Sequence, residues 1–126
     1  LPKKYYKKFR PARLTDRAVE KLAGPADRER FQILLAHSPL FFDAYSRWGA
    51  DLTLAGHFHG GTIRLPILGG VMTPQYQFFL PCCGGEFERD GRKMIVSRGL
   101  GTHSIPIRFN NKPQLVVVHL KKKPTF

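Results

Sequence analysis

Two short apolar runs organise the middle of the chain. Residues 31–36 and 51–55 are of strand length, and each is followed by a segment that contains histidine. Because residues 31–36 are apolar at nearly every position, we predict a strand covered on both faces. Residues 41–48 fit a helix that Gly49 ends, and this helix would be the crossover of a β-α-β unit if the two strands are parallel.

The rest of the pattern predicts one more helix and several further strands. Strands outnumber helices, so the expected fold class is α/β, on the border with α+β, with one sheet stacked on another. The expected elements are a helix over 14–22 capped by Thr15 or Asp16 and ended by Gly24-Pro25, a strand over 62–65, an ordered loop over 66–85, a hairpin over 86–97 around Asp90-Gly91, and a closing strand over 114–120.

Length and composition fit one globular domain. The chain has 126 residues, of which 42% are hydrophobic and 24% charged, and these values argue against whole-chain disorder. No apolar run approaches the roughly 18 residues of a membrane-spanning helix. The chain starts at Leu1 without a signal-peptide pattern, so we interpret its first residue as an internal position of a longer protein or a product of cleavage.

The charge is strongly positive, with 21 Lys and Arg against 9 Asp and Glu. Such a surface favours polyanions, acidic lipids or phosphorylated substrates. Residues 1–30 form a basic segment in which residues 3–10 interleave cations and aromatics, as single-strand binders do. A non-catalytic module that binds nucleic acid or acidic lipid is therefore the alternative hypothesis. The adjacent Cys82 and Cys83 have no C-x-x-C spacing, which disfavours a structural zinc site.

The segment from Gly56 to Gly61, G-H-F-H-G-G, carries the clearest chemistry. In extended backbone His57 and His59 would project to the same side, and the glycines would let a ligand approach closely. Imidazole is a common ligand of transition metals, so we predict a metal site rather than two structural histidines. His37 ends the other apolar run and would share one sheet edge with His57, unless it caps a helix or lies in the core.

Three other residues are candidates for contact with a phosphate group. Arg64 and Arg98 flank the glycine-rich segments and could each bind a substrate phosphate, the alternative being solvated surface arginines. His103 follows the glycine loop and could reach a phosphate, although loop histidines are more often merely exposed. His119 is interpreted as structural.

Several motifs together resemble the calcineurin-like metallophosphoesterase superfamily. They are L-L-A-H-S-P (34–39), G-A-D-L (49–52), G-H-F-H-G-G (56–61), S-R-G-L-G (97–101) and P-I-R-F-N (106–110). The last two are similar to a bacterial branch of membrane-associated phosphohydrolases. The resemblance runs in consistent order over roughly residues 31–120, so residues 31–126 are interpreted as the C-terminal part of such a domain.

The resemblance implies a β-sandwich flanked by helices that hydrolyses phosphate esters at two divalent ions such as Mn, Fe or Zn. It assigns His37 and His57 to one ion and His59 to the other. In this family two ions activate water and clamp the phosphoryl oxygens. The membrane-associated branch implies peripheral membrane association through a segment outside this chain, and nucleic acid is not the expected partner.

The chain departs from the family by lacking its D-x-H, G-D-x-x-D and G-N-H-[DE] motifs. No Asp precedes His by two residues, no Gly-Asp occurs, and the only asparagines are Asn110 and Asn111. The bridging aspartate and the general-acid histidine are therefore expected in a missing N-terminal half. We expect this chain to be inactive alone and to associate with that half or with a second copy of itself.

Overall fold

The computed structural model describes residues 13–59, 84–101, 108 and 110–122, together with the backbone of 63–65 and 69–72. Residues 1–12 of the basic segment, the two cysteines and His103 lie outside the described residues, as does the side chain of Arg64. None of the helices in the described part of the chain has the length and apolar character needed to cross a bilayer.

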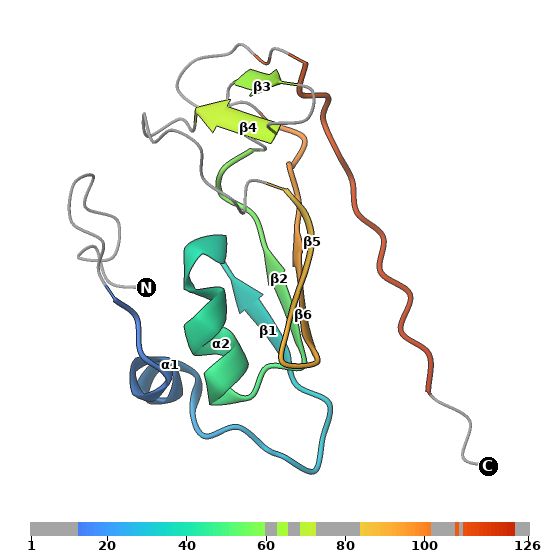
Figure 1. The fold of residues 1–126 in the computed structure, drawn as a ribbon. Coiled ribbons are helices and arrows are strands. Elements are labelled where there is room, and N and C mark those ends of the chain that lie inside the picture. Colours follow the sequence, from blue (N-terminus) through green and yellow to red (C-terminus); the bar gives the residue numbers. More distant parts are fainter. Residues whose placement is uncertain are drawn as a thin grey trace.

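A four-stranded mixed sheet forms the centre of the fold (Figure 1). Its order is β1 (Ile33–Ala36), β2 (Leu52–Ala55), β6 (Arg92–Val96) and β5 (Gly85–Arg89). The first three strands are parallel and end in register, with Ala36 opposite Ala55 and Ala55 opposite Val96. With two helices packed beside it, this sheet confirms the predicted α/β class.

The predicted β-α-β unit is also confirmed. The helix α2 (Phe42–Trp48) connects the parallel strands β1 and β2, after a 3-10 turn over Pro39–Phe41. Ser38 caps this turn by accepting a hydrogen bond from the backbone N–H of Leu40, and its own carbonyl accepts one from the Tyr45 hydroxyl at 3.0 Å. The turn directly after β1 is therefore fixed to the body of α2.

Both helices lie on the same side of the sheet, and the core lies between them and the strands (Figure 1). Phe42 of α2 packs on Ala55, Met94 and Val96, and Met94 is completely buried. The helix α1 (Asp16–Ala23), capped by the Thr15 side chain as predicted, packs on α2 through Val19. The sheet face that these helices cover is the apolar core of the described chain.

The opposite face of the sheet is exposed at β1, so the prediction that strand 31–36 is covered on both faces is wrong for the described residues. Leu35 is 78% exposed and Ile33 43%, because their side chains alternate with the covered Leu34 and Ala36. A groove of about 760 Å³ lies on this side, between strand residues such as Leu52 and Ile95 and the extended segment 116–120. The apolar run thus predicts a second covering layer that the described residues do not provide.

Other predictions had mixed outcomes. The hairpin is confirmed, since β5 and β6 meet at Asp90 and Gly91, with φ of 51° and 72° as expected for a tight turn. The prediction of a loop over 66–85 is wrong in part, because β4 (Gly69–Met72) lies within this range and pairs antiparallel with β3 (Ile63–Leu65). The prediction of a closing strand over 114–120 is also wrong, because this segment pairs with no strand among the described residues.

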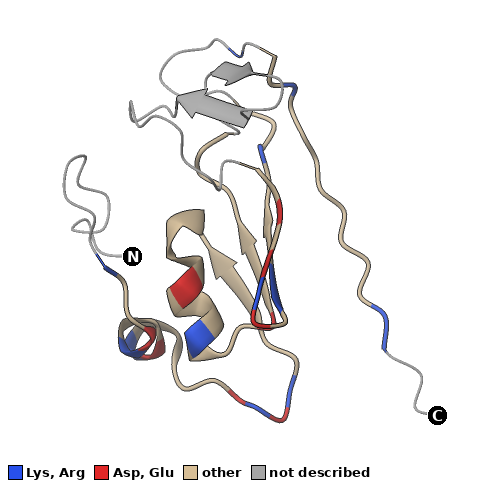
Figure 2. Cartoon of the chain, viewed as in Figure 1, with Lys and Arg blue, Asp and Glu red and all other residues tan. Residues whose placement is uncertain are grey.

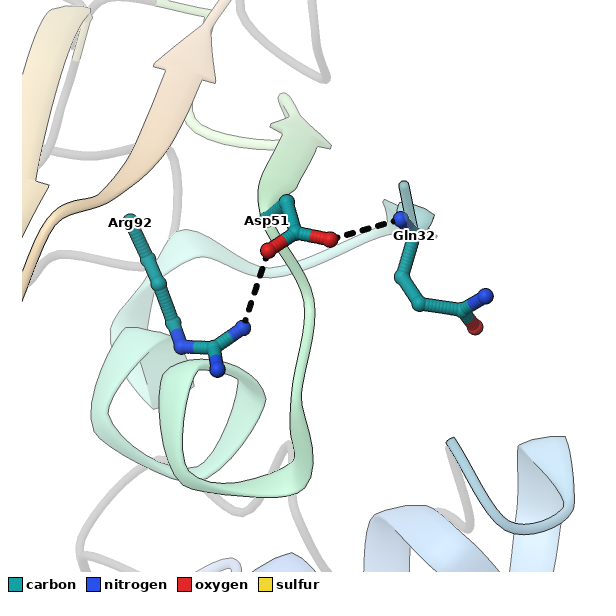
Figure 3. A network of polar contacts seen from close by, with 3 residues as sticks. All are labelled: Gln32, Asp51 and Arg92. Atoms are coloured by element: carbon teal, nitrogen blue, oxygen red, sulfur yellow. Dashed lines mark hydrogen bonds and ion pairs between the residues drawn. The ribbon is translucent and has the colours of Figure 1, made fainter. Parts of the chain in front are cut away.

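Asp51 ties together the starts of the three parallel strands (Figure 3). Its carboxylate accepts a hydrogen bond from the backbone N–H of Gln32 at 2.7 Å and pairs with the Arg92 guanidinium at 3.3 Å. Its backbone N–H donates to the carbonyl of Gln32 at 2.9 Å, and its carbonyl accepts from the N–H of Lys93 at 3.0 Å. One residue therefore fixes how β1, β2 and β6 align.

We predict that Asp51→Ala lowers the free energy of unfolding by about 1–2 kcal/mol, because a charged acceptor is lost beside a half-buried N–H and guanidinium. Urea denaturation measures the change. Asp43→Ala is the matched control, since Asp43 pairs with Arg89 on the surface and such pairs contribute about 0–1 kcal/mol. Equal effects of the two substitutions would contradict the role assigned to Asp51.

We predict that Thr53→Val stabilises the protein by roughly 1 kcal/mol. Thr53 is completely buried, and its hydroxyl oxygen has no hydrogen-bond partner among the described residues, so valine removes a buried polar atom at nearly constant volume. Thermal unfolding measures the change, and Thr53→Ala, which leaves a cavity, should destabilise. A lower melting temperature for Thr53→Val would show that the hydroxyl is hydrogen-bonded.

Candidate metal centre at the carboxyl edge of the sheet

The carboxyl ends of the three parallel strands bring the candidate residues to one edge. His37 follows β1 directly, Gly56 and His57 follow β2, and Ser97 and Arg98 follow β6. The N–H of Ser97 donates to the carbonyl of Ala55 at 2.9 Å, so the pairing of β2 with β6 continues to this edge. Ligand sites of α/β sheets lie at this edge.

His37 and His57 lie side by side at this edge. Their ring centroids are 4.1 Å apart and the ring planes are inclined by 48°. His37 is exposed, and the cap of the following turn comes from Ser38, which disfavours the alternatives of a core or helix-capping histidine. The structure thus brings two imidazoles together from adjacent strands, as the positions of these residues predicted.

His57 and His59 are not in extended backbone, so the prediction that they project to the same side of a strand is wrong. Their φ values are 74° and 48°, in the left-handed region that residues with a Cβ seldom adopt. β2 ends at Ala55, and the N–H of Phe58 donates to the carbonyl of Gly56 at 3.0 Å, which closes a tight turn. Phe58 is buried and anchors this turn.

His59 contacts a different part of the chain. Its Nδ1 lies 3.1 Å from the carbonyl oxygen of Gly101 and 3.5 Å from Nη2 of Arg108. Its own carbonyl accepts a hydrogen bond from Nδ2 of Asn111 at 2.6 Å. In the described part of the chain, no three or more His, Cys, Asp or Glu side chains form a group able to hold a metal, so His59 does not complete a ligand cluster with His37 and His57.

The donor atoms at this edge suit a borderline transition ion. Two neighbouring imidazoles are typical ligands for Zn, Fe, Ni or Cu, whereas Mg, Ca and Mn suit oxygen ligands. A His59 ring that donates Nδ1–H to a carbonyl keeps its lone pair on Nε2, and metal-binding histidines are commonly oriented in this way. The residues present therefore fit part of a metal site.

Carboxylates are absent from the same edge. All nine lie in the described residues, and none follows the end of β1, β2 or β6. Figure 2 shows acidic residues on the helices, in the loop before β1 and on the β5–β6 hairpin, and Asp51 precedes β2. The described edge therefore offers imidazole and guanidinium groups and no carboxylate.

Of the three predicted phosphate contacts, only Arg98 has a described side chain. It lies half-buried directly after β6, and its Nε donates to Oε1 of Gln114 at 3.1 Å. The backbone N–H of Arg98 shares the same acceptor at 3.3 Å. The roles of Arg64 and His103 stay predictions, as does the contact of Arg98 with phosphate.

The sequence analysis missed Arg108 and Asn111, which contact His59 from a distant part of the chain. Arg108 belongs to the P-I-R-F-N motif, so its position was noted without a role. No spacing rule links residue 59 to residues 108 and 111, because the contact depends on the loop that follows β6.

Two curated proteins are similar to the chain. A protein of Bacillus subtilis (strain 168), named uncharacterized metallophosphoesterase YkuE, is 37% identical over 91 residues, which is 72% of the chain and 31% of that protein. A protein of Aquifex aeolicus (strain VF5), named uncharacterized metallophosphoesterase, is 34% identical over 97 residues, which is 77% of the chain and 35% of that protein.

The chain thus spans about a third of the length of the curated relatives that it matches. No protein-family model matches the chain. No solved structure matches it either. The two similarities support membership of the chain in the metallophosphoesterase superfamily.

Proposed function

We propose that the chain forms part of a metal-dependent phosphoesterase that hydrolyses phosphate esters at two divalent ions. His37 and His57 bind one ion, and His59 binds the other. The observation that carries the proposal is the 4.1 Å approach of the His37 and His57 rings at the ends of adjacent parallel strands. The names of the two relatives support the same class of reaction.

The described residues have separate tasks in this proposal. The ions supply Lewis-acid chemistry that activates water and neutralises phosphoryl charge. The turn after β2 directs His57 towards His37, while His59 contacts the loop at Gly101. Arg98, which Gln114 holds through Nε, is placed to pair with a phosphoryl oxygen of the substrate.

The chain needs a partner to complete this centre. Two cations a few Å apart repel each other strongly unless an anionic ligand lies between them, and the carboxyl edge offers none. The open face around Ile33 and Leu35 also needs a cover. We propose that an N-terminal part of the same protein supplies both, because the relatives are about three times longer than the matched region.

We predict that His57→Ala or His59→Ala, in the full-length protein, lowers the kcat of phosphatase activity by about 100-fold or more. Each lost ligand removes charge stabilisation from the transition state, where about 1.4 kcal/mol is a factor of ten. Turnover of p-nitrophenyl phosphate at saturating Mn or Zn measures the effect. His119→Ala is the control and should change kcat little, since His119 is exposed on the extended segment.

Near-wild-type turnover of His57→Ala at saturating metal would refute the ligand assignment. Salt-dependent binding of an oligonucleotide, without any phosphatase activity of the full-length protein, would favour the alternative basic module instead.

We predict that residues 1–126 alone are inactive towards an aryl phosphate and self-associate. The imidazoles bring no negative charge, and the open apolar face of the sheet favours contact with another copy when its natural cover is missing. The measurements are turnover after loading with Mn or Zn, and mass in solution by light scattering.

The full-length protein is the control in both measurements. A monomeric chain of these 126 residues with turnover comparable to the full-length protein would contradict the proposal that the centre is shared with another segment.

A further inference from the structure

The Arg108 side chain contacts several backbone carbonyls of the loop over 97–101, which follows β6. Its Nη2 donates to the carbonyls of Arg98 at 3.1 Å and Gly99 at 3.3 Å, and it also contacts the carbonyl of Gly101. Gly99 has a φ of 67°, which a glycine adopts without strain, and this allows the loop to curl around the guanidinium. The two hydrogens of one nitrogen atom are thus shared among three backbone carbonyls.

The carbonyl of Gly101 links Arg108 to His59. A carbonyl oxygen can only accept, so its 3.1 Å contact with His59 requires the hydrogen on Nδ1. The 3.5 Å contact between Nδ1 and Arg108 would require the opposite tautomer, because a guanidinium can only donate. The shorter distance favours a ring that donates from Nδ1 and keeps its lone pair on Nε2, where a metal ion can bind.

Asn111 holds the backbone of the same histidine. Its side chain is 2% exposed, and its Nδ2 donates to the carbonyl of His59 at 2.6 Å. This bond crosses 52 residues of sequence and lies at a residue whose φ of 48° is unfavourable for a side chain with a Cβ. The contact therefore stabilises a turn that local propensity does not favour.

Arg108 is an internal residue of this loop. Its Nε and Nη1 are buried and have no hydrogen-bond partner in the part of the chain that the structure describes. A substrate phosphate needs exposed donors, whereas Nη2 is committed to backbone carbonyls. The geometry therefore favours a role in ordering the loop over contact with substrate.

We propose that Arg108 and Asn111 are positioning residues for His59. Arg108 fixes the carbonyl of Gly101 and, through it, the tautomer and orientation of the ring, while Asn111 fixes the turn that carries the ring. This inference rests on the proposed function, in which His59 is a metal ligand. Lysine does not replace Arg108, because its ammonium nitrogen ends one bond short of the position of Nη2 and cannot reach the same carbonyls.

The test is the affinity of each metal site in the full-length protein, measured without substrate. Purified protein is stripped of metal and titrated with Zn in competition with a chromophoric chelator, which gives the number of ions and the affinity of each. We expect Arg108→Lys and Asn111→Ala each to lower the affinity for one ion by about 10–100-fold and to leave the affinity for the other unchanged. A loss of this size is usual when a residue that orients a metal ligand is removed.

His59→Ala identifies which ion is affected, and Arg89→Lys is the control. Arg89 pairs with Asp43 on the surface, at the hairpin end of β5, so its substitution should weaken the binding of neither ion. If His59→Ala leaves both ions bound at wild-type affinity, the proposed ligand role fails. If His59→Ala loses an ion while Arg108→Lys and Asn111→Ala bind both normally, the positioning inference alone fails.

A second measurement does not depend on the folding of any arginine variant. Long-range proton–nitrogen spectra of the ¹⁵N-histidine-labelled, metal-free protein report the tautomer of each ring. We expect His59, assigned by the signal that His59→Ala removes, to carry its hydrogen on Nδ1. A hydrogen on Nε2 would overturn the inference, because Nδ1 would then accept from Arg108 and the lone pair would face away from a metal.

Discussion

The alignment of the three parallel strands at Asp51 is the constraint on which the candidate site depends. Its backbone and carboxylate bind Gln32 before β1, and its carbonyl and carboxylate bind Lys93 and Arg92 at the start of β6. Since strands in fixed register end at the same level, an anchor at their starts also sets where His37 and His57 meet. A slip of one residue would turn every side chain of a strand to the other face and separate the two rings.

The ends of the three parallel strands carry no carboxylate, and this absence limits the chemistry of the carboxyl edge. Its side chains include imidazoles and the Arg98 guanidinium but no carboxylate, and Asp51 lies at the opposite end of the parallel strands. Substrate phosphates suit such an edge, but two metal ions do not unless an anion separates them. The described residues also leave Leu35 exposed, on the face of the sheet that the helices do not cover.

Short-range sequence patterns predicted a helix cap, a tight turn and the crossover helix correctly. Thr15 as a cap, Asp90-Gly91 as a turn and the crossover helix all follow from short-range rules, and the structure confirms them. The strand expected over 114–120 failed because an apolar alternation does not say whether a neighbouring strand exists. The link from His59 to Arg108 and Asn111 could not be predicted, since it joins loops about 50 residues apart.

The left-handed turn at His57 and His59 explains why the spacing of these residues was misinterpreted and what the turn achieves. Alternation in a strand would place both rings on one side, where they would compete for a single ion. The turn instead sends His57 to His37 and His59 to the carbonyl of Gly101. Under the proposed function, this four-residue motif serves two separate ions. Its unfavourable backbone is supported by buried groups, Phe58 within the turn and Asn111 outside it.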